Sequence, residues 1–312
     1  MVTTALHLGK PKLTLFFCDM WGYEGYRFNP KDNFFYNMLS LKYDVSIDPQ
    51  PDLLIFSCFG DSYKTIRAKR KIYFSSELIN EKIIDPALYD LHLGIEPMNG
   101  SKMFVFFPHW VQYVNWFNIK SFKSLPQSPR YISTIEEIHY SSFDSLDFHK
   151  RKPICTFINN PTEFKLRTLL PICERYPIDH YGSFMNNTGG PLRLSEFDKL
   201  FVQGQYKLSF CAENISRSGY ISEKLLHCLA TKTIPIYDGD SSFESLISKN
   251  RVLYTGAFSG INEINAEIEN ILTSTDYYRS YLGGTSLNLD YLYSHSPLAL
   301  LDLIVAKLEL DL

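Results

Sequence analysis

The stretch from Lys207 to Asp240 constrains the fold more than any other part of this chain. An apolar segment at residues 208–211 is followed by a polar loop, a helix expected to begin near Ser222, and a second apolar segment at residues 233–237. Such a unit holds anionic ligands in α/β proteins, because the unpaired N–H groups of a helix N-terminus attract phosphate. Lys224 falls in the first helical turn, where the helix dipole disfavours a cation unless an anion is also present. A bound anion would explain this lysine, and a solvated lysine on a surface helix is the alternative.

Short apolar segments alternate with helical segments along most of the 312 residues. The pattern predicts strands at residues 13–17, 43–47, 53–58, 72–74, 92–95, 154–158 and 178–181, and helices at residues 33–41 and 162–173. This alternation favours an α/β fold with mostly parallel sheets that are covered by helices on both faces.

The chain is longer than a single hydrophobic core usually supports, so two domains are expected. A polar and basic segment at residues 140–153 interrupts the alternation, which places the domains at residues 1–150 and 151–312. The leucine-rich end, residues 297–312, is expected to be a helix of the second domain that packs on the body of the protein. Because its charges are mostly acidic, contact with an anionic membrane is not favoured.

Composition excludes several classes of protein. The net charge of −3 gives no indication of nucleic-acid binding. The six cysteines form no C-x-x-C pair, and they are expected to be reduced thiols of a cytoplasmic protein. The N-terminus lacks the pattern of a signal peptide, and no stretch is long and apolar enough to cross a bilayer.

Two further segments contain candidate functional residues. Glu77 follows a predicted strand, and ligands of open α/β sheets bind beyond the carboxyl ends of the strands, so this carboxylate is a candidate general base. A helix-capping role is the alternative. Arg167 lies one to two turns into a predicted helix, where a guanidinium can bind a diphosphate with two hydrogen bonds. It could equally pair with a surface acid such as Glu163.

The triplet Asp238-Gly239-Asp240 follows a predicted strand. Two such carboxylates can hold a divalent metal against a diphosphate, although Asp-Gly is also a common turn. The sequence contains no G-x-x-x-x-G-K-[ST] motif, no G-x-G-x-x-G after a strand, no G-x-S-x-G, no H-E-x-x-H and no zinc-like Cys/His spacing.

The segment from Phe210 to Gly239 resembles the signature of the α-1,3/4-fucosyltransferases. Phe210-Cys-Ala-Glu-Asn214, Gly219-Tyr220-Ile-Ser-Glu223-Lys224 and Thr233-Ile-Pro-Ile-Tyr-Asp-Gly239 stand in the order and spacing of the family's F-E-N, Y-V-T-E-K and T-V-P-V-Y-x-G motifs. Weaker similarities occur at Met20-Trp21-Gly22, Tyr73 to Glu77, Asn160-Pro161 with Arg167, Asp179 to Gly182 and Asn186-Asn187. The resemblance extends over residues 13–250, and the expected length and lack of a membrane anchor are more like the bacterial members than the Golgi enzymes.

This resemblance implies a GT-B fold, in which two Rossmann-like domains with parallel sheets face each other across a cleft. The first domain would bind the acceptor glycan, and the second would bind a GDP-sugar. No essential metal ion is implied, although stimulation by Mn²⁺ or Mg²⁺ stays open. The residues that the motifs carry over are the catalytic base Glu77 and the donor-binding residues Arg167, Gly182, Asn186, Asn214, Tyr220, Glu223 and Lys224. Arg167 and Lys224 would neutralise the diphosphate, and Glu223 would accept hydrogen bonds from the ribose.

The implied activity is inverting transfer of L-fucose, or a related sugar, from GDP to a hydroxyl of an acceptor glycan, with α-1,3 linkage to a GlcNAc-type sugar expected. Ala212 and Asp238 depart from the family pattern, where phenylalanine and an aromatic residue are usual, which leaves the sugar open. One alternative is a metal-dependent GT-A enzyme that uses Asp238 and Asp240. Another is a non-catalytic protein that binds a nucleotide or a glycan, which the presence of Glu77 beside the donor residues disfavours.

Overall fold

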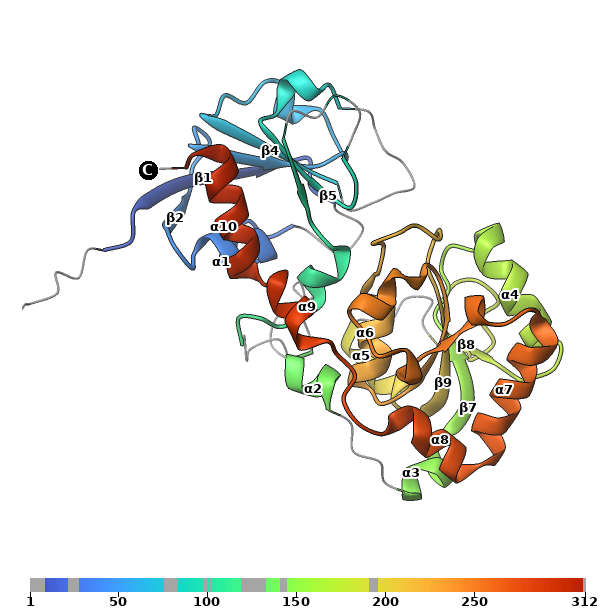
Figure 1. Ribbon diagram of the computed structural model, residues 1–312. Helices are drawn as coiled ribbons and strands as arrows, with labels where there is room; N and C mark the ends of the chain where they lie inside the picture. Colours follow the sequence, from blue (N-terminus) through green and yellow to red (C-terminus); the bar gives the residue numbers. More distant parts are fainter. Residues whose placement is uncertain are drawn as a thin grey trace, which may run out of the picture. The chain divides into compact units, whose positions relative to one another are not determined.

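A computed structural model of the chain describes residues 9–21, 28–75, 84–97, 100, 103–118, 133–140, 145–190 and 196–310. The residues form two compact units, and each contains its own parallel β-sheet (Figure 1). Unit 1 comprises the described residues up to Phe107 and from Ser296 onward, and unit 2 comprises those from Pro108 to His295. The prediction of an α/β protein with parallel sheets is confirmed.

Unit 1 is built on a six-stranded sheet in the order β2-β1-β3-β4-β5-β6, in which all neighbouring strands are parallel. β3 and β5 bury every residue, which is typical of strands covered on both faces. The strands are β1 (Lys12–Cys18), β2 (Asp44–Ile47), β3 (Leu53–Phe56), β4 (Arg70–Phe74), β5 (Leu91–Gly94) and β6 (Phe104–Phe106).

The C-terminal helix belongs to unit 1. α10 (Pro297–Leu308) packs against α1 (Phe34–Leu39), and the Tyr43 hydroxyl donates to the carbonyl of Leu310 at 3.2 Å. The division therefore differs from the predicted boundary at residue 150, because α10 belongs to unit 1 and unit 2 already begins at Pro108. A leucine-rich pattern predicts that a helix packs on a core, but it does not identify which core. Two 3₁₀ helices, η1 (Ser62–Lys64) and η2 (Pro86–Leu88), connect strands of this unit.

Unit 2 contains a five-stranded parallel sheet in the order β11-β10-β9-β7-β8. Its strands are β7 (Lys152–Thr156), β8 (Asp179–His180), β9 (Tyr206–Ala212), β10 (Ile234–Asp238) and β11 (Leu253–Tyr254). Its helices are α2 (Ile135–His139), α3 (Ser145–Lys150), α4 (Glu163–Cys173), α5 (Glu196–Gln203), α6 (Glu223–Ala230), α7 (Ile261–Thr273), α8 (Thr275–Leu282) and α9 (Leu289–Ser294). The described part of this unit also contains the 3₁₀ helices η3 (His109–Tyr113), η5 (Ser241–Ser245), η6 (Lys249–Arg251) and η7 (Thr255–Ala257).

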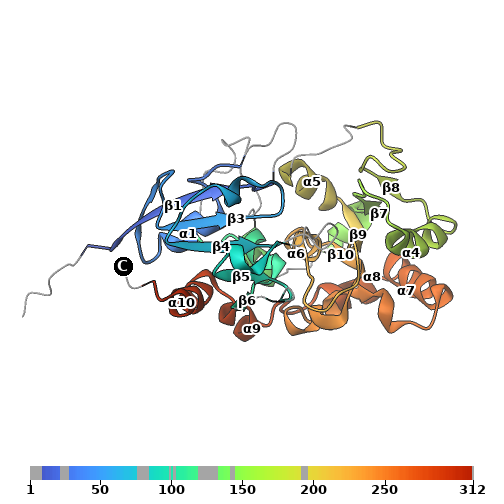
Figure 2. The same ribbon diagram turned by 90° about the horizontal axis from the view of Figure 1, so that it is seen from above.

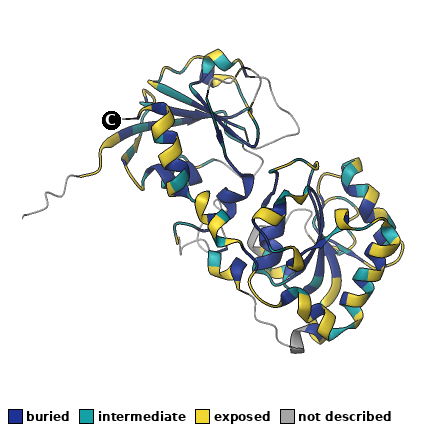
Figure 3. Cartoon of the chain, in the orientation of Figure 1, coloured by how far each residue is buried: buried dark blue, intermediate teal, exposed yellow. Residues whose placement is uncertain are grey.

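Helices cover both faces of the second sheet. α4 and α7 lie on one face, where Leu169 and Ile268 join a core with strand residues such as Ile236, and α5 and α6 lie on the other (Figures 1 and 2). The strands of both units are largely buried, while the helices expose their outer sides (Figure 3). In the part of the chain that the structure describes, no helix is long and apolar enough to span a membrane.

Candidate functional site

The strand–loop–helix–strand unit that the sequence predicts is present in unit 2. β9 ends at Ala212, α6 begins at Glu223, and β10 pairs with β9 in parallel. Ser222 is the N-cap residue of α6, but its hydroxyl donates to the buried carboxylate of Glu213 instead of capping the helix. The positive end of the α6 dipole is therefore left without a side-chain cap, and it can interact with an anion.

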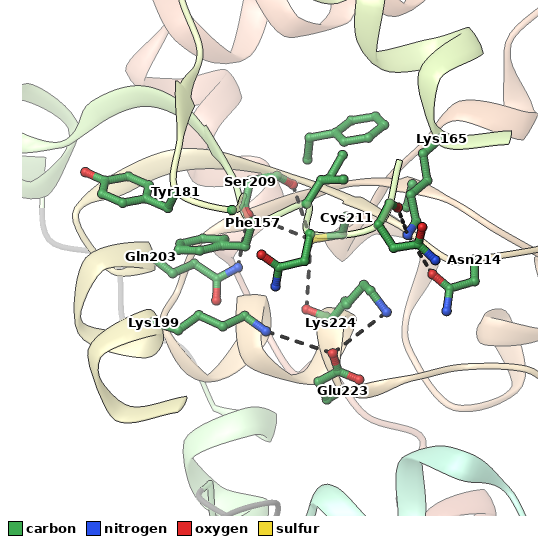
Figure 4. Close-up of a pocket in the computed structure, with 16 residues that line it drawn as sticks. Phe157, Lys165, Tyr181, Lys199, Gln203, Ser209, Cys211, Asn214, Glu223 and Lys224 are labelled. Carbon is green, nitrogen blue, oxygen red and sulfur yellow. Dashed lines mark hydrogen bonds and ion pairs between the residues drawn. The ribbon is translucent and has the colours of Figure 1, made fainter. Parts of the chain in front are cut away.

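A cavity of about 260 Å³ lies beside this helix start, at the carboxyl ends of β7 and β9 (Figure 4). Parallel α/β sheets bind their ligands at this end of the strands. All the residues that line the cavity belong to unit 2. Its charged residues are Lys165, Lys199, Lys224 and Glu223, and its aromatic residues are Phe157, Tyr181 and Phe210.

Lys224 is one of the cations that line the cavity. Its Nζ lies 3.1 Å from Glu213 Oε2, donates to Ser222 Oγ at 2.8 Å, and lies 3.8 Å from Glu223 Oε1. Burial lowers the pKa of Lys224, but the carboxylates of Glu213 and Glu223 outweigh that effect and raise the pKa well above its usual value. The ammonium is therefore charged at neutral pH and can stabilise an anionic ligand.

Lys165 is the second cation of the cavity, and it comes from the first turn of α4. Its Nζ donates to the carbonyl of Asn160 at 2.8 Å and to Asn214 Oδ1 at 2.6 Å, so it ties α4 to the loop after β9. Burial, followed by the nearby charge of Lys224, lowers the pKa of Lys165 to about 8. An anion bound in the cavity would favour the charged form.

Glu223 places a carboxylate between cations in the same cavity. Its Oε1 lies 3.8 Å from Lys224 Nζ and 3.9 Å from Lys199 Nζ. Burial raises the pKa of Glu223, but the charges of Lys224, Lys199 and His227 outweigh it and hold the pKa well below its usual value. The cavity therefore offers an ionised acceptor beside two ammonium groups, a combination that suits a ligand with both hydroxyls and phosphates.

Two aromatic rings form the opposite end of the cavity. Phe157 and Tyr181 are stacked, with ring centroids 5.5 Å apart and an interplanar angle of 21°. The Tyr181 hydroxyl lies 2.8 Å from that of Tyr206, which in turn donates to Asp179. These hydrogen bonds hold the Tyr181 ring in place, and the two rings can contact a flat apolar group such as a nucleobase.

Two predicted donor residues shape the loop beside these rings. A Cβ on Gly182 would come within 2.0 Å of the carbonyl of Ile158, so only glycine permits the close approach of the two backbones that line the cavity. Asn186 does not line the cavity. Its Nδ2 donates to the carbonyl of Gly182 at 3.1 Å, and it thereby stabilises the loop.

Four of the predicted donor-binding residues line the cavity, namely Gly182, Asn214, Glu223 and Lys224. The other predicted donor-binding residues do not. Tyr220 is buried with its ring 5.7 Å from that of His109, and it is not part of the cavity lining. Glu77 and Gly22 lie outside the described residues.

Arg167 and Lys165 line different cavities. Its Nη2 donates to Asp238 Oδ1 at 3.3 Å, and its guanidinium lies 4.1 Å from the centre of the Phe164 ring. It lines a separate cavity of about 400 Å³ together with Thr168 and Asp238. The cation that α4 contributes to the 260 Å³ cavity is therefore Lys165 and not Arg167.

The carboxylates of Asp238 and Asp240 both accept hydrogen bonds from the chain. Asp238 Oδ2 accepts from the Thr168 hydroxyl at 2.6 Å, and Asp240 Oδ1 accepts from the backbone N–H of Ser242 at 2.9 Å. Asp240 is thus the N-cap residue of η5. Within the described ranges, no three His, Cys, Asp or Glu side chains gather closely enough to hold a metal ion.

Sequence reasoning missed Lys165, Lys199, Phe157 and Tyr181 as residues of the site. Lys165 carries the same signal as Lys224, since Thr162 caps α4 and places this lysine in the first helical turn. Lys199 has no comparable local signal, because its position in the cavity depends on how α5 packs on the sheet.

The pKa of Lys165 predicts how the binding of an anionic ligand, such as the GDP that the family resemblance implies, should vary with pH. Its ammonium is protonated below about pH 8, so affinity should be highest there and should fall as the pH rises past 8. Lys165→Arg should remove this decline, because a guanidinium stays charged throughout the range. Isothermal titration between about pH 7 and pH 9 would measure the affinity of the wild-type protein and of the variant. Arg167→Met serves as the control, since Arg167 lines the other cavity. If Lys165→Arg retained the wild-type decline, another group would be responsible.

Comparison with known proteins agrees with this architecture. The sequence profile of the α-(1,3)-fucosyltransferase FucT N-terminal domain matches residues 15–113, and that of the C-terminal part of glycosyltransferase family 10 (fucosyltransferase) matches residues 148–286. The chain is similar to a crystallised α1,3-fucosyltransferase, with a TM-score of 0.70 and 20% identity over 100% of this chain and 94% of that one. A structure of an α1,3-fucosyltransferase with GDP is similar at a TM-score of 0.68 and 18% identity, again over 100% of this chain and 94% of that one. The similarity to these solved structures confirms the predicted GT-B type of fold.

The chain is also similar to parts of two longer curated proteins. The α-(1,3)-fucosyltransferase FucT of Helicobacter pylori is 22% identical over 298 residues, which are 89% of this chain and 61% of that protein. A putative fucosyltransferase of Acanthamoeba polyphaga mimivirus, R654, is 27% identical over 164 residues, which are 49% of this chain and 27% of that protein. The chain thus spans less than two thirds of these relatives' length. The two family profiles match most of the chain, one on the sheet of unit 1 and the other on the cavity-bearing sheet of unit 2, and the chain belongs to glycosyltransferase family 10, the fucosyltransferases.

Proposed function

We propose that this protein is an inverting glycosyltransferase that transfers L-fucose from GDP-fucose to a hydroxyl group of an acceptor glycan. The observation that carries this proposal is the cavity of unit 2, where Lys165 and Lys224 lie beside the uncapped start of α6 and the acceptor Glu223. A nucleoside diphosphate matches these features, since its phosphates need cations and its ribose needs a hydrogen-bond acceptor.

The proposed reaction is a displacement at the anomeric carbon of fucose. Negative charge grows on the GDP diphosphate as it leaves, and the ammonium groups of Lys165 and Lys224 stabilise it. Glu77 takes the proton of the attacking hydroxyl, as the resemblance to the family implies. Because two lysines supply the positive charge at the diphosphate, we propose that no metal ion is essential and that Mn²⁺ or Mg²⁺ at most stimulates the reaction.

The identities of the transferred sugar and of the acceptor are inferred from fewer residues than the nucleotide site. Ala212 lines the cavity, whereas Asp238 does not, so the replacement of phenylalanine by Ala212 is the departure that bears on the sugar. We propose α-1,3 transfer to a GlcNAc-type sugar of a surface-glycan precursor, supported by the similarity to α-(1,3)-fucosyltransferases. The cytoplasmic location expected from the cysteines stays a prediction.

Turnover of a donor panel tests the proposed function. The purified protein is incubated with GDP-fucose, GDP-mannose or UDP-galactose and with a GlcNAc-containing oligosaccharide, and the nucleotide and the glycan product are measured. We expect GDP release from GDP-fucose that depends on the acceptor and proceeds with EDTA present. Loss of activity in EDTA with recovery in Mn²⁺ would favour the metal-dependent alternative, and GDP binding without turnover would favour the non-catalytic one.

A further inference from the structure

The carboxylate of Glu223 is held between two lysines that reach it from different elements. Lys224 follows Glu223 in α6, whereas Lys199 comes from α5 on the other side of the cavity (Figure 4). Their Nζ atoms lie 3.8 Å and 3.9 Å from the same oxygen, Oε1. These distances are those of ion pairs and are too long for hydrogen bonds. Both lysines therefore attract the carboxylate without occupying its lone pairs.

The oxygens of Glu223 are consequently available to a ligand. No hydrogen bond from the described residues reaches this carboxylate, although its side chain is only 19% exposed. A carboxylate that is ionised accepts hydrogen bonds and donates none. A ligand that enters the cavity with a vicinal pair of hydroxyl groups can supply the donors, and the ribose of a nucleotide carries such a pair.

The two lysines differ in what else holds them. Lys224 is fixed by Glu213 at 3.1 Å and by Ser222 at 2.8 Å, so its position does not depend on Glu223. Lys199 lies in the cavity wall with 16% of its side chain exposed, and its Nζ is 6.0 Å from the centre of the Phe157 ring. It thus lies between the aromatic end of the cavity and the carboxylate. Removal of Lys199 would take away the charge that attracts Glu223 toward α5, while Lys224 and its partners stay in place.

We propose that Lys199 is a positioning residue of the donor site, which orients Glu223 to accept hydrogen bonds from the ribose hydroxyls and so makes the site selective for ribonucleotides. This inference rests on the proposed function, because it takes the ligand to be a nucleoside diphosphate. It assigns a role to α5, an element that contributes none of the residues predicted from the sequence motifs.

The test compares the affinities for GDP and 2′-deoxy-GDP by isothermal titration. The wild-type protein should prefer GDP by about tenfold or more, because a hydrogen bond to a charged group is lost with the 2′-hydroxyl. Lys199→Met should weaken GDP binding and reduce the preference to about threefold or less, since Glu223 is then no longer oriented. Lys199→Arg should retain the preference, because it restores the charge. A merely structural role of Lys199 would weaken the binding of both nucleotides equally.

Two further variants make the test decisive. Glu223→Gln should also lose the preference, and adding Lys199→Met to it should cost little more, because both changes act through one interaction. Lys249→Met removes an exposed lysine elsewhere and should behave as wild type. If circular dichroism shows that Lys199→Met is unfolded, Lys199→Gln replaces it.

The outcomes separate this inference from the proposed function. A folded Lys199→Met variant with the full wild-type preference for GDP would overturn the inference, as would a wild-type protein that binds both nucleotides equally. In either case GDP still binds, and the proposed function stands. A wild-type protein that binds no GDP would overturn the proposed function itself.

Discussion

Replacing Lys224 by methionine is expected to weaken GDP binding by at least about 30-fold and to lower the free energy of unfolding by about 3–5 kcal/mol. The first effect follows because this ammonium belongs to the first turn of α6, lines the cavity and is only 25% exposed. The second follows because Glu213 is fully buried and would lose its cationic partner at 3.1 Å. Isothermal titration and urea unfolding measure the two effects separately.

A second substitution distinguishes binding from stability. In the double variant Glu213→Gln/Lys224→Met, no carboxylate is left buried without a cation at this position, so most of the lost stability should return. GDP binding should stay weak, because the charge that we propose contacts the diphosphate is still missing. If the double variant regained GDP affinity together with stability, Lys224 would be a structural residue and not a ligand-binding one.

Replacing Glu77 by glutamine is expected to lower the transfer rate by about 10²–10⁴-fold, because the attacking hydroxyl then lacks its general base. GDP affinity should be unchanged, since the proposed nucleotide site is made of residues of unit 2. The rate is measured with GDP-fucose and a saturating acceptor, and the affinity by titration with GDP. The assignment of Glu77 comes from the resemblance to the family, so this variant tests that resemblance directly.

Two results would separate a base from a binding residue. Glu77→Asp keeps the carboxylate but shortens the side chain, and it should retain part of the activity that glutamine loses. A Glu77→Gln variant that transfers fucose at the wild-type rate would remove Glu77 from the mechanism. It would leave the nucleotide site of unit 2 as proposed.

The parts of the fold that depend on local pattern could be predicted from the sequence. The segment from β9 to β10 is an example, because buried strands, a polar loop and a helix with apolar periodicity each have a local signature. Ser222 was expected near the helix start, and it is the N-cap residue of α6. The short strands β6 and β11 were not predicted, since three and two residues leave too short a pattern.

The site could be predicted only where one motif holds several of its residues. Asn214, Glu223 and Lys224 share such a motif, and they meet in the cavity. On α4, by contrast, the sequence predicts Arg167 as a donor residue and makes no prediction for Lys165. Residues two apart on a helix point about 200° away from each other, so Lys165 and Arg167 face different cavities. Which of them faces the nucleotide site depends on how α4 packs, and the local sequence does not reveal this.

Contacts between elements that lie far apart in the sequence could not be predicted from local sequence patterns. Lys199 reaches Glu223 only because α5 and α6 cover the same face of the sheet, and α10 packs on α1 across more than half of the chain. Helical periodicity predicts that each helix has a buried face, but the neighbour of that face is a property of the tertiary structure.

The affinity of the purified protein for GDP relative to UDP tests the central claim most directly. Isothermal titration with both nucleotides, in the presence of EDTA, should give clear binding of GDP and much weaker binding of UDP. Lys224→Met should weaken GDP binding by at least about 30-fold in the same experiment. Tighter binding of UDP than of GDP, or GDP binding that Lys224→Met leaves unchanged, would contradict the assignment of this cavity as the GDP-sugar site.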